Sequence, residues 1–155
     1  MPNQRRIGGA SLEARDVSLI ALLEANARTP IAALARALGI SPQSVSERIK
    51  RLQDLGILAG FTVVLDPARL GLGIGAYIRI RPAMGELARV AHIVADIPEV
   101  IECDRVTGED CFFAKAFVAN VADLESVIDR LIPYARTNTS IIQSSPVPRR
   151  LPRYA

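Results

Sequence analysis

The stretch TPIAALARALGISPQSVSERIKRLQDLG, residues 29–56, carries two helix start signals and two glycine stop signals at close spacing. The pairs TP at its start and SP at 41–42 each place a capping residue before a proline, an arrangement favoured in the first turn of a helix. Gly39 and Gly56 follow apolar stripes and are typical of helix ends. We therefore predict two short helices joined by a sharp turn, which is the sequence form of a helix-turn-helix.

The segments on either side complete this unit. Leucines and isoleucines recur at helical spacing after Ser11, which predicts a first helix over 12–26 with Ser11 as its cap. After the helix-turn-helix, apolar residues alternate over 57–65 up to the turn Asp66-Pro67, and this predicts a strand that leaves the helical unit and serves as wing and linker together.

From residue 71 the pattern changes to alternating strands and amphipathic helices. The order is βαββαβ, with strands near 74–81, 100–107, 111–119 and 137–144, and helices near 87–97 and 124–131. This order predicts a ferredoxin-like antiparallel sheet with both helices on one face. An apolar sheet face left in water is unfavourable, so we expect a second copy of the chain to cover it.

The predicted fold class is therefore α+β, an N-terminal winged helix-turn-helix followed by a C-terminal ferredoxin-like βαββαβ sandwich. The expected domains are a flexible N-terminus 1–11, a DNA-binding domain 12–60, a linker strand and turn 61–70, an oligomerisation and effector-sensing domain 71–145, and a tail 146–155.

Composition narrows the function classes. Residues 1–60 hold eight Arg or Lys against five Asp or Glu, whereas 61–155 hold eleven of each, so the excess positive charge lies where a polyanion partner is expected. No apolar run is long enough for a membrane span and no secretory signal opens the chain, which predicts a cytoplasmic protein without a membrane partner. Cys103 and Cys111 lack metal-ligand spacing, so we expect no metal and a reduced state.

The second helix of the pair supplies the candidate contacts to double-stranded DNA. Its apolar stripe faces the core, which leaves glutamine, serine and charged side chains on the flanks and outer face. Gln suits adenine, Arg suits guanine, Glu can accept from cytosine, and a capped helix N-terminus suits a phosphate. The predicted DNA-binding residues are Ser41, Pro42, Gln43, Ser44, Glu47, Arg48, Lys50, Arg51 and, before the pair, Arg28. Arg36 is either a phosphate contact or a plain surface charge.

The two halves together resemble the Lrp/AsnC family of feast/famine regulators over about 12–145. The strongest part is LEARDVSLIALLEANARTPIAALARALGISPQSVSERIKRLQDLGILAGF, residues 12–61, with its opening Leu-x-x-x-Asp, its Gly-Ile-Ser-Pro turn and its Arg-Ile-x-Arg-Leu ending. The C-terminal half adds ADIPEV, VTGEDCFF and TNTSII. The resemblance implies a wing-bearing DNA domain, a ligand-sensing domain, amino acids as effectors, and homodimers that assemble into octamers.

The resemblance also implies where an effector binds. The family's ligand cleft is lined by segments that match the hairpin and the last strand, which gives the effector-binding candidates Gly108, Glu109, Asp110, Cys111, Thr137, Thr139 and Ser140. A turn rich in N–H groups suits an amino acid's carboxylate, and an acidic side chain suits its ammonium group. The hairpin reads Gly-Glu-Asp-Cys, and the stretch 133–137 lacks the family's Pro-Gly-Val, so the effector itself stays open.

Two other functions are alternatives to a regulator. An enzyme similar to siroheme decarboxylases needs histidine and arginine groups around a large planar substrate, and this chain has only His92. No catalytic triad, P-loop or dinucleotide-binding pattern is present, so we expect no catalytic residue and no cofactor. An architectural DNA-binding protein without an effector is the other alternative. A redox switch between Cys103 and Cys111 is also disfavoured, because neither has a basic neighbour.

Overall fold

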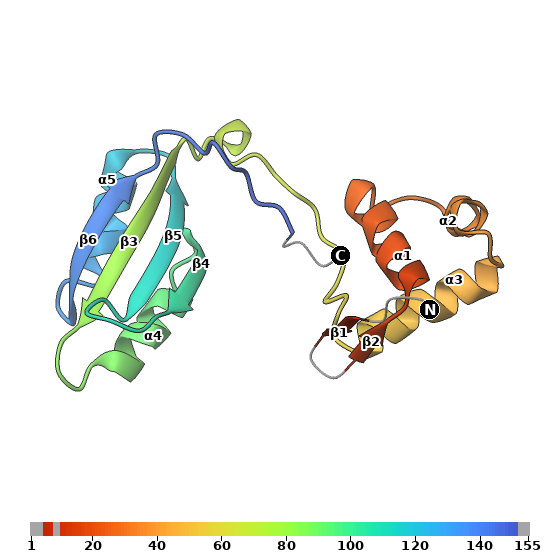
Figure 1. The fold of residues 1–155 in the computed structure, drawn as a ribbon. Coiled ribbons are helices and arrows are strands. Elements are labelled where there is room, and N and C mark those ends of the chain that lie inside the picture. The colour runs from red at the N-terminus through yellow and green to blue at the C-terminus, as the bar shows by residue number, and fades with distance from the viewer. Residues whose placement is uncertain (1–4, 8–9, 152–155) are drawn as a thin grey trace. The chain divides into compact units, whose positions relative to one another are not determined.

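A computed structural model describes residues 5–7 and 10–151. The chain forms two compact units: the first runs up to Val63 and also takes in the chain from Arg150, and the second is Val64–Arg149. Figure 1 shows a helical unit at the N-terminal end and an αβ unit built around a four-stranded sheet.

The N-terminal unit consists of a short hairpin and three helices. β1 (Arg5–Ile7) pairs antiparallel with β2 (Ala10–Leu12), and α1 (Ala14–Ala25), α2 (Ile31–Leu38) and α3 (Pro42–Asp54) follow. The predicted flexible segment 1–11 therefore differs from the structure at 5–7 and 10–11, where strands form; residues 1–4 and 8–9 lie outside the described residues.

Local signals explain most of the helix ends. The Ser41 hydroxyl accepts a hydrogen bond of 3.1 Å from the Ser44 amide, and Pro42 is the first residue of α3. Gly39 ends α2 with φ +63°, a left-handed conformation that favours glycine. α1 begins two residues later than predicted and is capped by Glu13 instead of Ser11. The Glu13 amide donates to the Asp16 carboxylate at 2.9 Å, which fixes that end.

The three helices share one apolar core. The apolar stripes predicted for the helices converge there, and the turn between α2 and α3 lets both helices pack against α1. The buried side chains are Leu12, Leu19, Leu23, Leu34, Ala35, Val45 and Leu52.

The predicted wing strand over 57–65 is wrong for the isolated chain. Residues 57–65 have no regular secondary structure, and Val63 and Val64 are 77% and 95% exposed. A strand needs a hydrogen-bonding partner along its length, and no described residue of this chain pairs with the segment. A 3₁₀ turn, η1 (Ala68–Leu70), follows before the second unit begins its sheet.

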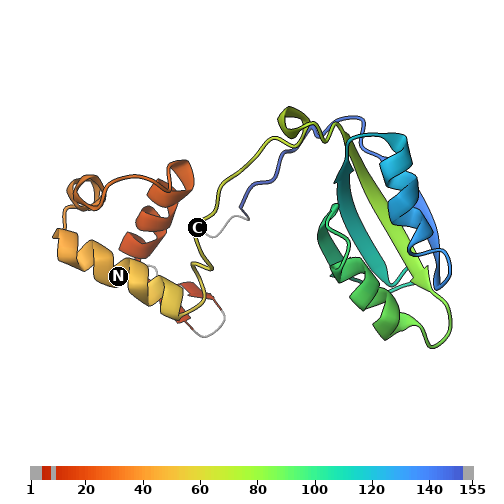
Figure 2. The ribbon, with the colours of Figure 1, turned by 180° about the vertical axis from the view of Figure 1, so that it is seen from behind.

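The second unit has the predicted order βαββαβ. It consists of β3 (Ile74–Pro82), α4 (Leu87–Ala95), β4 (Val100–Arg105), β5 (Phe112–Val118), α5 (Val121–Asp129) and β6 (Ala135–Ile141). The strands lie in the order β4-β5-β3-β6 and all neighbours are antiparallel. Seen from behind in Figure 2, α4 and α5 cover the same face of the sheet. The predicted α+β fold is confirmed.

Alternation along β3 separates the two faces of the sheet. Ala76, Ile78 and Ile80 are buried beneath the helices, while Tyr77 and the residues in step with it point to the other face. The uncovered face mixes aromatic and charged groups: Tyr77 is 47% exposed, and the Lys115 ammonium lies 5.6 Å from the centre of its ring. It is therefore less uniformly apolar than the sequence led us to expect.

Candidate nucleic-acid interface and effector region

The orientation of α3 decides which of its side chains face outward. Val45 and Leu52 are fully buried against α1 and α2, which turns the opposite side of the helix to solvent. Gln43, Glu47 and Lys50 are exposed on that side. The Gln43 amide donates a 3.0 Å hydrogen bond to the Glu47 carboxylate, so these two side chains hold each other along the helix surface.

The N-terminus of α3 is also exposed. Ser41 and Pro42 are solvent-accessible, and the Ser41 hydroxyl lies 2.9 Å from the half-buried Ser44 hydroxyl. The first turn of a helix presents backbone N–H groups and the positive end of the helix dipole. This end of α3 therefore has the chemistry to meet an anion such as a phosphate.

Arg48 and Arg51 have partners inside the protein. One Arg48 nitrogen lies 2.8 Å from the Asp16 carboxylate and another lies 2.8 Å from Glu13, and Arg51 pairs with the second Asp16 oxygen. Arg48 is only 20% exposed, and its hydrogen bonds to Glu13 and then Asp16 raise the pKa of its guanidinium. Sequence reasoning placed both arginines at the DNA surface and did not foresee these ion pairs.

Asp16 enters the sequence analysis only as the last residue of the Leu-x-x-x-Asp motif, and in the structure it is the partner of both arginines. Its side chain has no exposed surface, and it is the one buried charged side chain among residues 12–151. A signal for it exists in the sequence. Asp16 falls at helical spacing within the buried stripe of Leu12, Leu19 and Leu23, where a carboxylate needs a cationic partner.

Arg28 lies in the connection between α1 and α2. Its backbone amide donates 2.9 Å to the Asn26 side chain, and the Thr29 hydroxyl donates 2.7 Å to the Asn26 carbonyl. This small turn leaves the Arg28 residue exposed. Arg36, in the last turn of α2, is exposed as well.

The acidic residues of the hairpin between β4 and β5 face arginines of β3. The Asp110 carboxylate lies 3.8 Å from Arg79, and the Glu109 carboxylate lies 3.5 Å from Arg81. Gly108 turns the chain with φ +120°. Glu109 and Asp110, the predicted partners of an effector's ammonium group, therefore each lie beside an arginine of this chain.

The hydroxyl candidates on β6 divide between the two faces of the sheet. Thr137 and Thr139 pair with Ile80 and Ile78, whose side chains are buried beneath the helices, whereas Ser140 pairs with Tyr77 of the uncovered face. The structure thus brings the two threonines together and separates them from Ser140. The Thr139 hydroxyl oxygen is buried and has no hydrogen-bond partner among the described residues.

The two cysteines do not face each other. Cys103 pairs with Ala114, and the Cys111 carbonyl accepts from the Val106 amide, so the two lie at different steps of the hairpin. Cys103 is exposed, and partial desolvation of its thiol, followed by the charge of Asp104, raises the pKa of that thiol. Within residues 5–7 and 10–151, no group of three potential ligands is placed to hold a metal ion, and no helix is long and apolar enough to cross a membrane.

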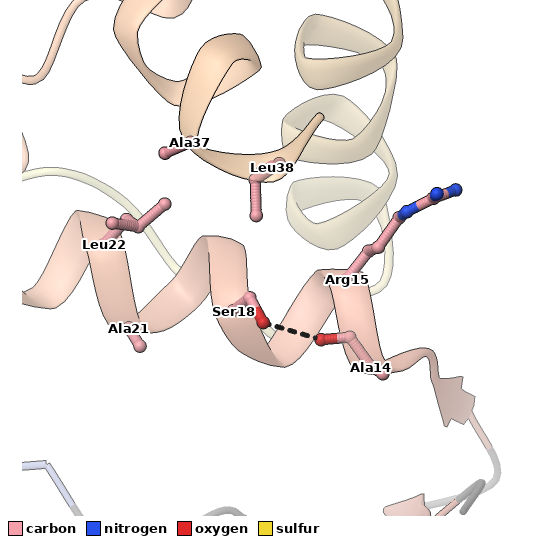
Figure 3. A pocket seen from close by; sticks show the side chains of 7 residues that line it. All are labelled: Ala14, Arg15, Ser18, Ala21, Leu22, Ala37 and Leu38. Carbon is pink, nitrogen blue, oxygen red and sulfur yellow. Dashed lines mark hydrogen bonds between the residues drawn. The ribbon is translucent and has the colours of Figure 1, made fainter. Parts of the chain in front are cut away.

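An open groove lies between α1 and α2 (Figure 3). Its lining is mostly small and apolar, and the one dashed contact in Figure 3 is the Ser18 hydroxyl donating 3.1 Å to the Ala14 carbonyl. The lining residues are Ala14, Arg15, Ser18, Ala21, Leu22, Ala37 and Leu38. None of the predicted DNA-binding or effector-binding residues lies in it.

A helix-turn-helix with an exposed second helix, joined to a βαββαβ domain, defines the class of transcription regulators with a separate sensing domain. The AsnC-type helix-turn-helix model matches residues 13–53, and the Lrp/AsnC ligand binding domain model matches residues 75–152. The chain belongs to the Lrp/AsnC family.

Three known proteins illustrate the similarity. The DNA-binding transcriptional activator DecR of Escherichia coli K12 is 32% identical over 78% of this chain and 82% of its own. The structure of Bacillus subtilis LrpC matches with a TM-score of 0.83, at 27% identity, over 88% of this chain and 97% of its own. A Neisseria meningitidis transcriptional regulator solved as a complex with L-Met shares the fold at a TM-score of 0.79 and 24% identity, over 89% of this chain and 93% of its own.

Proposed function

We propose that this regulator reads double-stranded DNA with the exposed side of α3 and its capped N-terminus. The carrying observation is that Gln43, Glu47 and Lys50 point outward from a helix whose opposite side is locked into the core. Gln43 is the candidate for a base edge, Lys50 for a phosphate, and the Ser41-Pro42 end for a second phosphate. Ser44 supports the cap, and Arg28 is a further phosphate candidate.

The sequence predicts Arg48 and Arg51 as direct DNA contacts, whereas this proposal gives them no direct contact. Both are held by Asp16, so the direct contacts are assigned to the exposed residues around them. Protein–DNA hydrogen bonds go largely to phosphates, which fix the position of the protein, while a few side chains read the bases. In this proposal Gln43 reads a base and Lys50 contacts a phosphate, so variants of the two residues can distinguish the two kinds of contact.

A small effector, an amino acid, is proposed to alter the assembly or the DNA binding of the protein. Support comes from the ligand-binding domain over 75–152 and from the L-Met complex of the Neisseria protein. The candidate residues remain the hairpin Gly108 to Cys111 with Thr137, Thr139 and Ser140 of β6. Thr139 is the favoured candidate on β6, because its buried hydroxyl has no hydrogen-bond partner within the described part of the chain and would gain from one.

Assembly into homodimers, and of dimers into octamers, is part of the proposal. Tyr77 and Phe113 leave 47% and 41% of their surface exposed on the uncovered sheet face, and the exposed segment 61–65 has unpaired backbone. We expect a second copy of the chain to cover these features, because unpaired backbone and exposed aromatic groups are unfavourable in water. We expect sedimentation of the wild type to show an oligomer and Phe113→Glu to shift it towards smaller species. A monomeric wild type at micromolar concentration would contradict this part.

One experiment tests the regulator function itself. The full chain is incubated with sheared genomic DNA from its source, since we expect a cytoplasmic protein to meet that DNA. The retained fragments are then sequenced, with and without amino acids in the incubation. We expect a limited set of fragments, and an amino acid that changes the set or its occupancy. Retention of all fragments alike, with no response to any of the twenty amino acids, would favour an architectural DNA-binding protein instead.

A further inference from the structure

The carboxylate of Asp16 lies where α1 meets α3. It contacts Arg48 at 2.8 Å, pairs with Arg51 through its other oxygen, and accepts the Glu13 amide at 2.9 Å. Its side chain is completely buried, while the two arginines are 20% and 40% exposed. Glu13, half-exposed, adds a second carboxylate to Arg48 at 2.8 Å.

These contacts change the charge that α3 presents to DNA. The helix carries three cationic side chains, Arg48, Lys50 and Arg51, and two of them point to α1. A guanidinium that faces a buried carboxylate is held by a charge-assisted hydrogen bond in a medium of lower dielectric than water. Lys50 is the most exposed of these three cations, and it is therefore the one best placed to contact a phosphate.

Free guanidinium groups would bind any DNA. Each phosphate contact adds affinity that does not depend on sequence and steepens the fall of log K with log salt by about 0.9. Two arginines freed from α1 would therefore raise binding to every duplex, the wrong ones included. Specificity is a difference of affinities, so withholding such contacts improves it.

We infer that Asp16 is a specificity-determining residue of this protein: it withholds Arg48 and Arg51 from the DNA backbone while it fixes α3 against α1. Glu13 strengthens the hold on Arg48. The inference rests on the proposed DNA-reading function of α3 and adds to it a residue that touches no DNA. Asp16 is thus a positioning residue that acts through the two arginines.

The test compares two duplexes over a salt series. One duplex carries a sequence taken from the retained genomic fragments and the other carries the same bases scrambled. Fluorescence anisotropy is recorded for the full-length wild type, Asp16→Asn, Glu13→Gln and Glu125→Gln. Glu125 is exposed on α5 of the other unit, so its variant removes one negative charge without touching α3.

For Asp16→Asn we expect tighter binding to the scrambled duplex, a salt slope steeper by about 0.9 for each arginine released, and a smaller ratio between the two duplexes. Glu13→Gln frees one arm of Arg48 and should move the scrambled duplex in the same direction by a smaller amount. Glu125→Gln should match the wild type.

A purely structural role gives a different pattern. Parallel loss of affinity for both duplexes at an unchanged salt slope in Asp16→Asn would overturn the inference. If circular dichroism shows that Asp16→Asn does not fold, Glu13→Gln decides, and equality of Glu13→Gln with Glu125→Gln overturns it. A wild type that binds both duplexes equally would contradict the proposed sequence-specific function, and this inference, which rests on that function, would be overturned with it.

Discussion

Asp16 on α1 and Arg48 on α3 lie 2.8 Å apart and join the first helix of the N-terminal unit to the last across 32 positions of sequence. The carboxylate is wholly buried and the guanidinium mostly so. Because a buried carboxylate without a cation is unfavourable, the two helices cannot move apart without exposing or orphaning a charge. The pair therefore holds α1 and α3 together and also neutralises a buried charge.

Arg48→Ala should destabilise the N-terminal unit. The change removes the guanidinium that contacts both carboxylates, although Asp16 keeps Arg51 and the Glu13 amide. We expect the free energy of unfolding to fall by about 1.5–3 kcal/mol, the range for the loss of a hydrogen bond between charged groups. Urea unfolding followed by circular dichroism measures it. Arg36→Ala, an exposed arginine on α2, is the control and should stay within about 0.5 kcal/mol of wild type.

This expectation changes how an alanine substitution at Arg48 is interpreted. The sequence alone predicts that Arg48→Ala weakens DNA binding because a base or phosphate contact is lost. With the ion pair in place, a loss of DNA binding would follow also from a displaced α3. Equal stability of the Arg48 and Arg36 variants would contradict the structural role and return Arg48 to the list of direct contacts.

Short-range signals predicted the helix-turn-helix well. Ser41 with Pro42, and Gly39, act within one turn of backbone, so residue type alone indicates where α2 ends and α3 begins. The order βαββαβ was accessible for the same reason, because alternation and helical spacing are local patterns.

Features that depend on distant partners were predicted less well. The segment 57–65 has the alternation of a strand, but alternation does not supply the second strand that its backbone needs. The pairing of Asp110 with Arg79 spans 31 positions, and no local rule places these residues side by side. The effector candidates on β6 were separated by a register that only the folded sheet defines.

Ser41→Ala tests the cap of α3. The Ser41 hydroxyl accepts from the Ser44 amide at 3.1 Å, and alanine leaves that donor without its partner. We expect a loss of about 1 kcal/mol in stability. Ser46→Ala is a matched control, because the Ser46 hydroxyl donates only to the Pro42 carbonyl within the same helix. Thermal melts of the two variants should differ, and equal melting temperatures would show that the cap contributes little.

Gly39→Ala tests the turn between α2 and α3. Gly39 has φ +63°, and an added Cβ would meet no atom within 4 Å, so any cost comes from backbone conformation and not from crowding. We expect a destabilisation of about 1–2 kcal/mol. Gly60→Ala also meets open space and has no positive φ, so it should be neutral. A Gly39 variant as stable as the Gly60 variant would refute the conformational explanation.

Cys103 should react slowly with alkylating agents in the folded protein. In a Cys111→Ser background Cys103 is the remaining cysteine. It is exposed, so access does not limit its reaction, and partial desolvation followed by the charge of Asp104 raises the pKa of its thiol. The folded form keeps its proton at pH values where the unfolded thiol has lost it. The stabilisation from this shift is present below the unfolded pKa and disappears as pH rises through the folded pKa. Iodoacetamide at pH 8 should label the urea-unfolded chain faster, and equal rates would contradict the shift.

Lys50→Ala and Gln43→Ala should affect DNA binding in different ways. Lys50 is exposed and is assigned to a phosphate, so its loss should weaken a selected and a scrambled duplex alike and reduce the salt slope by about 0.9. Gln43 is assigned to a base edge, and a bidentate contact of this kind discriminates by roughly 1–3 kcal/mol. Its loss should lower affinity for the selected duplex by about tenfold and leave the scrambled duplex unchanged.

The comparison of these two variants distinguishes a phosphate contact, which positions the protein, from a base contact, which reads the sequence. Gln43 shares a 3.0 Å hydrogen bond with Glu47, so Glu47→Gln is a third variant that keeps size and removes charge while Gln43 stays in place. If Gln43 reads a base, Glu47→Gln should keep more of the preference for the selected duplex than Gln43→Ala does. Should Gln43→Ala and Lys50→Ala both weaken the two duplexes equally, the exposed face of α3 would hold only backbone contacts, and the source of sequence preference would lie elsewhere in the protein.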